Sequence, residues 1–236
     1  MLAFDIGNGS IKYGLFRDGA LASHGRLAPD ADLAPIPRDE PAAAVSVNPA
    51  LLARLRAHLP GLRVIGEDVE LPLAVDYDPP GDCGADRILG VAGALALRPR
   101  APGVLLLDAG TCLTATVGLR DRGVLGGAIL PGLDLMADAL AAGTAQLPRV
   151  EPHLPEGPLG RSTAESIRVG LHAAVRGAAR ELIRDLRAAA PVPLDVVLAG
   201  TGARALGAAL PEADAIEPHA TLHGVFVACG TARRGA

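Results

Sequence analysis

Two short motifs place an aspartate two residues before a glycine, Asp5-x-Gly7 and Asp108-x-Gly110. Each follows an apolar run typical of a buried strand, so each puts a carboxylate where the chain turns. The glycine lets backbone N–H groups approach an anion such as a phosphate closely. Because a carboxylate repels a phosphate unless a cation lies between them, the two motifs together predict Mg²⁺ or another cation.

Side chains beside the two motifs can donate hydrogen bonds to phosphate oxygens, namely Asn8, Ser10, Lys12 and Thr111. Lys12 is the only lysine of the chain, and all its other basic Lys/Arg residues are arginine. GC-rich codon usage explains this excess of arginine over lysine most simply. One such turn would be weak evidence, because Asp and Gly are ordinary turn residues. Two turns in a repeated context favour a phosphate site.

The motifs belong to an internal repeat, because residues 2–27 resemble residues 104–130. Each copy has an apolar run, the Asp-x-Gly turn, a β-prone run, a charged turn with glycine and a third apolar run, which predicts a three-stranded meander. A duplicated meander with helices favours an α/β fold of two similar domains, residues 1–103 and 104–236, with a cleft between them. Chance similarity of two glycine-rich hairpins is the alternative.

Apolar periodicity and helix breakers predict the remaining elements. Helices are expected at residues 49–60, 87–98, 133–142, 164–189 and 221–233, and strands at 63–65 and 194–199. Residues 29–41, rich in Pro and Ala, have the composition of a surface loop.

Composition argues against several classes of protein. A formal net charge of −4 is not that of a general nucleic-acid binder. The three cysteines are far apart in the sequence, which disfavours a disulfide framework or a zinc motif and fits a reducing cytosol. The first residues lack the basic segment of a signal peptide, and no apolar run is long enough to span a bilayer. We therefore expect a cytoplasmic protein without nucleic-acid or membrane partners.

Other well-known catalytic signatures are missing from the chain. There is no GxxxxGK[ST] loop, no GxGxxG opening a helix, no GxSxG elbow and no HExxH. The six histidines are scattered, so each is more simply a surface or core residue than a metal ligand.

Further motifs follow in an order that resembles the type III pantothenate kinases, the dimeric branch of the actin/hexokinase/acetate-kinase superfamily. The resemblance extends nearly from end to end. DIGNGSIK at residues 5–12 resembles the first phosphate motif of the family, and LLLDAGTCLT at 105–114 resembles the second phosphate strand. Tyr77 precedes Gly84-Ala85-Asp86-Arg87, which matches the family's GxDR. GGAILPG at 126–132, TAQLP at 144–148, GRSTAESIRVG at 160–170 and the glycine-rich adenine loop LAGTGAR at 198–204 match later motifs.

The resemblance implies two duplicated ribonuclease-H-like domains, the actin/sugar-kinase-like fold, in a homodimer. It implies ATP-dependent phosphorylation of pantothenate to 4'-phosphopantothenate, the first step of coenzyme A biosynthesis. Mg²⁺ and a monovalent cation, K⁺ or NH₄⁺, are the implied cofactors beside ATP.

The resemblance also implies roles for single residues. Asp86 is the general base, and Asp108 matches the position of the monovalent cation. The residues implied to bind ATP are Asp5, Ile6, Gly7, Asn8, Gly9, Ser10, Ile11, Lys12 and Thr111. The residues implied to bind pantothenate are Tyr77, Gly84, Ala85, Asp86, Arg87 and Thr163.

The chemistry of these residue types agrees with such roles. An alcohol is a poor nucleophile, so a carboxylate near its proton is useful, and positioning with charge neutralisation supplies most of the rest. Simpler roles stay open: Asp86 or Thr163 could cap a helix, and Tyr77 could pack in its loop.

Two positions depart from the family pattern, and one alternative function stays open. Gly9 stands where the family usually has Thr, with Ser10 as a substitute, and Thr116 stands where the family often has Asp. These departures bear on ATP contacts and on the cation site. The alternative is a non-catalytic accessory or regulatory protein on the same fold.

Overall fold

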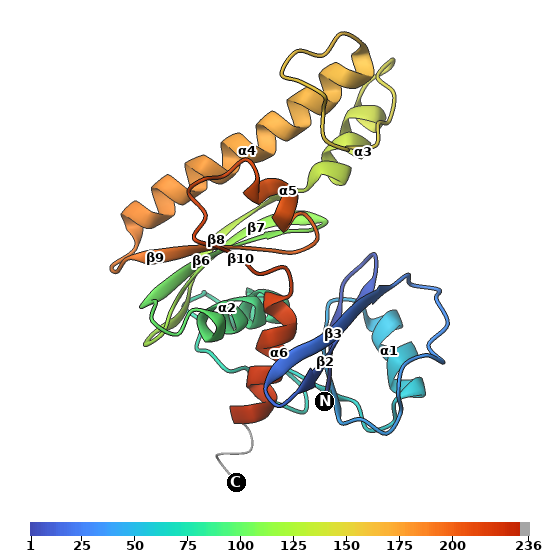
Figure 1. The fold of residues 1–236 in the computed structure, drawn as a ribbon, viewed down its shortest axis with the longest axis vertical. Coiled ribbons are helices and arrows are strands. Elements are labelled where there is room, and N and C mark those ends of the chain that lie inside the picture. Colours follow the sequence, from blue (N-terminus) through green and yellow to red (C-terminus); the bar gives the residue numbers. More distant parts are fainter. Residues whose placement is uncertain (232–236) are drawn as a thin grey trace. The chain divides into compact units, whose positions relative to one another are not determined.

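The computed structural model describes residues 1–231, which form two five-stranded sheets with helices around them (Figure 1). The first sheet has the order β3-β2-β1-β4-β5, and the second has the order β10-β9-β6-β7-β8. The strands of the first sheet are β1 Leu2–Ile6, β2 Ile11–Arg17, β3 Ala20–Leu27, β4 Ala42–Ser46 and β5 Arg63–Val64. Those of the second are β6 Gly103–Ala109, β7 Cys112–Leu119, β8 Gly123–Pro131, β9 Leu194–Ala199 and β10 Ala215–Ile216.

The two halves of the chain repeat one topology. Each half begins with a three-stranded meander, and the fourth and fifth strands then add on the far side of the first strand. A short helix separates the fourth and fifth strands in both halves, α1 Pro49–His58 in one and α5 Ala203–Gly207 in the other. A helix follows the fifth strand in both, α2 Ala85–Leu97 and α6 Ala220–Thr231. The α/β class and the duplication are therefore confirmed.

The second half has two additional helices between its third and fourth strands. These are α3 Leu133–Gly143 and α4 Thr163–Ala189, where the first half has only the predicted loop. The structure adds elements that the sequence pattern did not predict: β4, α5, β10 and a 3₁₀ turn at Pro80–Asp82. Helix α2 starts at Ala85, before the predicted residue 87, and residues 232–233 of the last predicted helix lie outside the described residues.

The described residues form two compact units. The first comprises Met1–Val104, Gly118–Gly126 and the chain from His219, and the second comprises Leu105–Val117 and Gly127–Pro218. A division into two duplicated domains at residue 103 stays a prediction.

Strand β1 lies at the centre of the first sheet and is buried along its whole length. On one face, Phe4 packs with Leu52 and Leu55 of α1. On the other face, Ala3 packs with Leu222 of α6. Burial on both faces explains why this strand is a continuous apolar run interrupted only by Asp5.

Helices α2 and α6 cross at a point where two glycines meet the partner backbone (Figure 1). A Cβ atom on Gly93 would overlap the carbonyl oxygen of Ala220, and one on Gly224 would overlap the carbonyl oxygen of Leu89. The crossing therefore requires glycine on both helices, and it fixes α2, whose first turn carries the predicted base.

In the second unit, α3 and α4 share a small core made by Ala137, Val150, Ile167 and Leu171. Helix α4 buries a stripe of residues spaced by four, Ile167, Leu171, Val175, Ala179 and Ile183, as one face of a helix requires.

Candidate active site

The first Asp-x-Gly turn joins β1 to β2 and presents exposed backbone. Asp5 is paired with Lys12 in the register of the two strands, and Lys12 Nζ lies 3.0 Å from Asp5 Oδ2. The Gly7 N–H donates to the carbonyl oxygen of Ser10 at 3.1 Å, which closes the turn and leaves Asn8 and Gly9 exposed. The ion pair thus lies directly beside backbone that can reach an anion.

The other residues of the first motif are core residues. Ile6 and Ile11 are 1% and 0% exposed and pack among the core side chains of the first unit, and Ser10 is 6% exposed. A ligand at this turn can therefore reach Asn8 and Gly9, whereas the side chains of Ile6 and Ile11 hold the turn in place.

The GxDR motif forms the first turn of α2. Gly84 is the cap residue, and Asp86 and Arg87 lie in the first helical turn. Asp86 is therefore not the N-cap of α2, so capping the helix does not explain its presence. The guanidinium of Arg87 lies 5.7 Å from the centre of the Tyr77 ring, a cation–π distance, so Tyr77 contributes to holding Arg87 in position.

The environment of Asp86 suits a base. Burial raises the pKa of Asp86 first of all, and the nearby charge of Asp5 raises this pKa further. Backbone N–H groups of Asp86 and Arg87 and the charge of Arg87 oppose this change. A carboxylate with a raised pKa accepts a proton more readily, which is what a general base for an alcohol needs.

The second Asp-x-Gly turn joins β6 to β7 in the second unit. Its carbonyl oxygen at Ala109 accepts a hydrogen bond from the Gly202 N–H at 2.9 Å, so the LAGTGAR turn packs directly against it. Gly200 has a φ of +83°, and a Cβ there would overlap the carboxylate of Asp108. This position therefore admits only glycine, and the two turns form one continuous surface.

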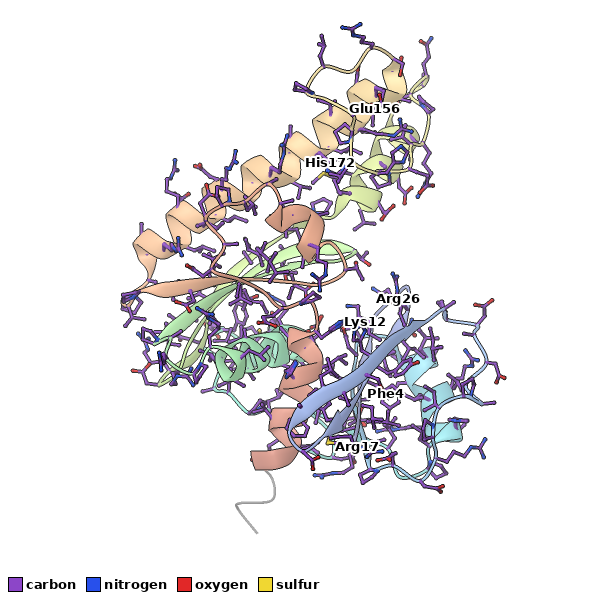
Figure 2. The ribbon with its side chains drawn as sticks, in the orientation of Figure 1. Phe4, Lys12, Arg17, Arg26, Glu156 and His172 are labelled. Atoms are coloured by element: carbon purple, nitrogen blue, oxygen red, sulfur yellow. The ribbon has the colours of Figure 1, made fainter. Side chains whose placement is uncertain are left out.

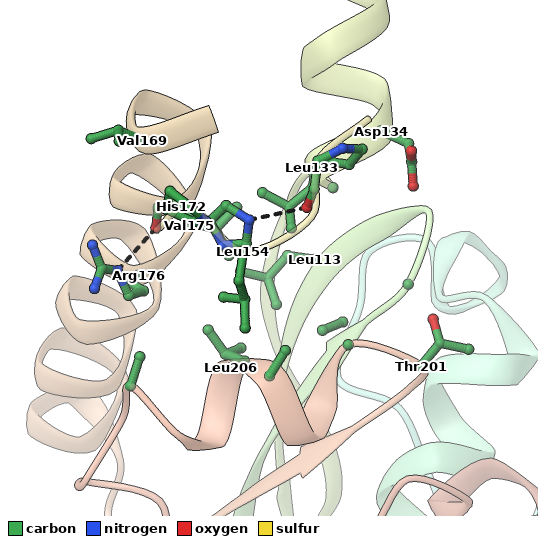
Figure 3. A pocket seen from close by; sticks show the side chains of 18 of the residues that line it. Leu113, Leu133, Asp134, Leu154, Val169, His172, Val175, Arg176, Thr201 and Leu206 are labelled. Carbon is green, nitrogen blue, oxygen red and sulfur yellow. Dashed lines mark hydrogen bonds between the residues drawn. The ribbon is translucent and has the colours of Figure 1, made fainter. Parts of the chain in front are cut away.

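A cavity of about 490 Å³ opens beside these two turns, between α4, α5 and residues 152–158 (Figure 3). Gly110, Thr201 and Gly202 line one part of it. The remainder is mainly apolar, with Leu113, Leu133, Leu154, Val169, Val175 and Leu206 in its wall. An apolar cavity of this size next to a glycine turn that is predicted to bind phosphate would fit a flat organic group that carries phosphates.

Residues 152–158 are held over the cavity by helix α4. His172 Nε2 lies 3.0 Å from the carbonyl oxygen of Pro152, and since a carbonyl can only accept, the imidazole N–H donates (Figure 3). Leu154 is 62% exposed although it lines the cavity, so a ligand there would cover it. Sequence reasoning missed this segment and His172; the only signal was three prolines in the stretch PHLPEGP.

Thr163 is the first residue of α4. The N-cap is Ser162, whose side-chain oxygen accepts from the Glu165 N–H at 3.2 Å, so Thr163 is not needed as a cap. Its predicted role toward a substrate stays a prediction.

The predicted site residues thus fall into two groups. The first unit brings together Asp5, Lys12, Tyr77, Asp86 and Arg87, and the second unit contains Asp108, Thr111 and Thr163. Within residues 1–231 there is no group of three or more His, Cys, Asp or Glu side chains that could hold a metal ion. Mg²⁺ at phosphoryl-transfer sites needs only one or two carboxylates beside the phosphates, and Asp5 and Asp108 each supply one carboxylate at a turn of their own unit.

Thr116, the second departure from the family pattern, is 1% exposed within β7. No helix among the described residues combines the length and the apolar character that crossing a membrane requires.

The family model and the curated relatives that match this chain all name one family. The family model for type III pantothenate kinase matches residues 1–185. A type III pantothenate kinase of Thermus thermophilus is 31% identical over 246 residues, covering 96% of this chain and 97% of the relative. A second one, of Rhodopirellula baltica, is 38% identical over 74% of this chain and 64% of its own length. A third, of Chlorobium luteolum, is 50% identical over 48% of this chain and 42% of its own length, so these two matches span less than two thirds of the relatives.

Solved structures show the same fold at low identity. A Baf family protein of Campylobacter jejuni, described as a transcriptional activator, has a TM-score of 0.66 and 16% identity, with 99% of this chain and 100% of that chain covered. A ROK family glucokinase of Streptomyces griseus has a TM-score of 0.52 and 12% identity, with 98% and 99% covered. At these identities the likeness concerns the fold, and it confirms the actin/sugar-kinase-like fold.

Proposed function

The chain belongs to the type III pantothenate kinase family, and from that premise we propose that it transfers the γ-phosphoryl group of ATP to the primary hydroxyl of pantothenate. The products are ADP and 4'-phosphopantothenate. The observation that carries this proposal is the arrangement of Asp86 in the first turn of α2, near the Asp5 charge and with Arg87 beside it. A non-catalytic protein on this fold has no need of a carboxylate with a raised pKa at that place.

In the proposed reaction, the carboxylate of Asp86 accepts the proton of the pantothenate hydroxyl as its oxygen attacks the γ-phosphorus. The bond between the γ-phosphorus and the bridging oxygen breaks, and ADP leaves with the electron pair. Because phosphoryl transfer leaves the protein little covalent chemistry to perform, positioning and charge neutralisation supply most of the catalysis.

Arg87 is suited to the carboxylate of pantothenate. Its guanidinium offers paired N–H donors that match a carboxylate, and the Tyr77 ring restricts its orientation. Ala85 and Gly84 contribute backbone at the start of the helix, where anions are favoured. We assign Thr163 to the same substrate by resemblance.

Each of the two units has residues that are proposed to bind the nucleotide. In the first unit these are Lys12 and the exposed turn at Asn8 and Gly9, and in the second unit it is Thr111. The continuity between the Asp108–Thr111 turn and the cavity supports a base in that cavity, with phosphates at the turn.

Two cations are part of the proposal. Asp5 would supply a carboxylate for Mg²⁺ beside the phosphates, and Asp108 with neighbouring carbonyls would hold K⁺ or NH₄⁺. When bound, these ions neutralise charge on the phosphates and on the leaving group.

A cytoplasmic homodimer is also proposed, on the family resemblance. Most apolar residues of α2 and the apolar stripe of α4 are buried within the chain itself, so these buried residues give no separate support for a partner. The exposed apolar side chains of the described residues include Ile129, 61% exposed on the edge strand β8, and Leu159, 74% exposed.

The test is ATP consumption by the purified protein with and without pantothenate, in Mg²⁺ and K⁺. ADP formation that depends on pantothenate supports the proposal. ADP formation at the same rate without it, or none in either case, contradicts it. The accessory-protein alternative predicts no turnover. The solved Baf family protein that is described as a transcriptional activator is 16% identical to this chain, and that likeness supports only a shared fold.

A further inference from the structure

Three charged residues form one row across the first sheet. In the register of the strands, Asp5 is opposite Lys12 and Lys12 is opposite Arg26. Residues directly opposite each other in an antiparallel pair project from the same face of the sheet. Figure 2 shows Lys12 and Arg26 at the same end of that sheet.

This row lies on the face that carries the proposed active site. Ala3, two residues before Asp5 on the same face, packs with Leu222 of α6. His24, two residues before Arg26, stacks at 4.0 Å between ring centres on His219, directly before α6. Asp86 lies near enough to Asp5 for the Asp5 charge to raise the pKa of Asp86. Arg26 therefore shares a face with the base and the ion pair.

The position of Arg26 is electrostatically unfavourable. Like charges directly opposite in a sheet are destabilising, and here an arginine stands opposite the only lysine of the chain. Lys12 binds Asp5, whereas Arg26 has no acidic partner among the described residues. Arg17, also on this hairpin, is paired with Glu40. The row thus carries one positive charge more than its carboxylate neutralises.

The position of Arg26 indicates what would neutralise it. The Lys12–Arg26 pair is next to Ile11–Leu27, the first pair after the Gly7–Ser10 turn. The exposed backbone of that turn and the two cations therefore line the same place. A guanidinium binds phosphate oxygens through paired N–H donors, which Lys12 cannot do.

From this geometry we infer that Arg26 binds the phosphates of the nucleotide, as a second cation opposite Lys12, an assignment that rests on the proposed function. It explains why two cations stand side by side without an acidic partner for one of them. A competing explanation is edge protection, since β3 is an edge strand and charge on an edge discourages pairing with another chain.

The test compares Arg26→Gln with Arg63→Gln. Arg63 is an exposed arginine on β5, the opposite edge strand of the same sheet, so the control makes the same change of charge at the other edge. Binding of ATP is measured by calorimetry without pantothenate, and KM is measured for each substrate. We expect Arg26→Gln to weaken ATP binding roughly tenfold or more, because a charge-assisted hydrogen bond is lost. Arg63→Gln should bind ATP like the wild type.

Thermal unfolding with and without ATP separates phosphate binding from edge protection, because edge protection gives ATP no contact with Arg26. Relief of the Lys12–Arg26 repulsion should leave nucleotide-free Arg26→Gln at least as stable as the wild type, while the stabilisation by added ATP shrinks. Arg26→Lys, which keeps the charge and loses the paired donors, should show an intermediate loss of affinity.

Three results would overturn the assignment: unchanged ATP affinity in Arg26→Gln, equal losses in both glutamine variants, or a rise confined to the KM of pantothenate. The last would place the pantothenate carboxylate at Arg26. If the wild type binds ATP and does not phosphorylate pantothenate, the proposed function fails, whereas a selective loss of ATP binding in Arg26→Gln would still support the phosphate contact.

Discussion

Replacing Asp86 with asparagine separates proton acceptance from the other roles of this side chain. Asparagine keeps the volume and keeps an oxygen that can accept from the backbone N–H groups of Asp86 and Arg87. It loses the negative charge and the basicity. A general base contributes about 10²- to 10⁴-fold to the rate, so we expect turnover to fall by about that factor, or about 3–5 kcal/mol in the barrier.

Stability should change in the opposite direction. Burial and the Asp5 charge raise the pKa of Asp86, so ionising it costs the folded state free energy that the unfolded chain does not lose. The stability linked to this group is fully present below the unfolded pKa and is lost as the pH rises through the raised, folded pKa. At neutral pH, Asp86→Asn should therefore unfold at the same temperature as the wild type or higher.

The assay is steady-state turnover with saturating ATP and pantothenate, together with thermal unfolding and a pH profile. In the wild type, kcat/KM should fall as the pH is lowered through the raised pKa of Asp86, and this limb should be absent from the residual activity of Asp86→Asn. Turnover near that of the wild type would refute Asp86 as the base. A large loss of stability would instead assign it a structural role.

Further predictions concern the helix start, the cations and the assembly. A Cβ on Gly84 would lie 2.5 Å from Asp86 Oδ1, so Gly84→Ala should displace the carboxylate and lower kcat by up to about 10²-fold. Because alanine is a poorer N-cap than glycine, its unfolding temperature should also fall slightly. Unchanged kcat would show that the carboxylate position is not critical. Activity should require Mg²⁺ and be higher in K⁺ or NH₄⁺ than in Na⁺ at constant ionic strength. Equal rates in K⁺ and Na⁺ would remove the monovalent cation from Asp108. Light scattering after size exclusion should give the mass of a dimer, and mixing Asp86→Asn with Thr163→Ala chains should restore some activity if two chains share a site. A fully active monomer would contradict the homodimer.

Much of the fold could be predicted from local sequence patterns. The two meanders could be predicted because apolar strands alternate there with turns of Asp and Gly. Strand β4 was missed because Ala42–Ser46 is mostly alanine, which has little β-propensity, and its strand state comes from parallel pairing with β1. Helix α5 and strand β10 are too short, at five and two residues, for a periodic pattern.

Candidate site residues could be recognised in the sequence only where they lie close together along the chain. The Asp5–Lys12 pair and the GxDR turn are local, and the structure shows both as compact features. The cavity combines residues 109–113, 132–134, 152–158, 169–176 and 201–209, so no single segment reveals it. Arg26 becomes notable only when the strand register places it opposite Lys12.

The most direct test of the account follows the phosphoryl group itself. Purified protein is mixed with ATP labelled in its γ-phosphate, with pantothenate, Mg²⁺ and K⁺, and the label is traced by chromatography. We predict that the label appears in phosphopantothenate as ADP forms in equal amount, and that Asp86→Asn slows both together. Label released only as inorganic phosphate, or equal transfer by Asp86→Asn, would contradict the account.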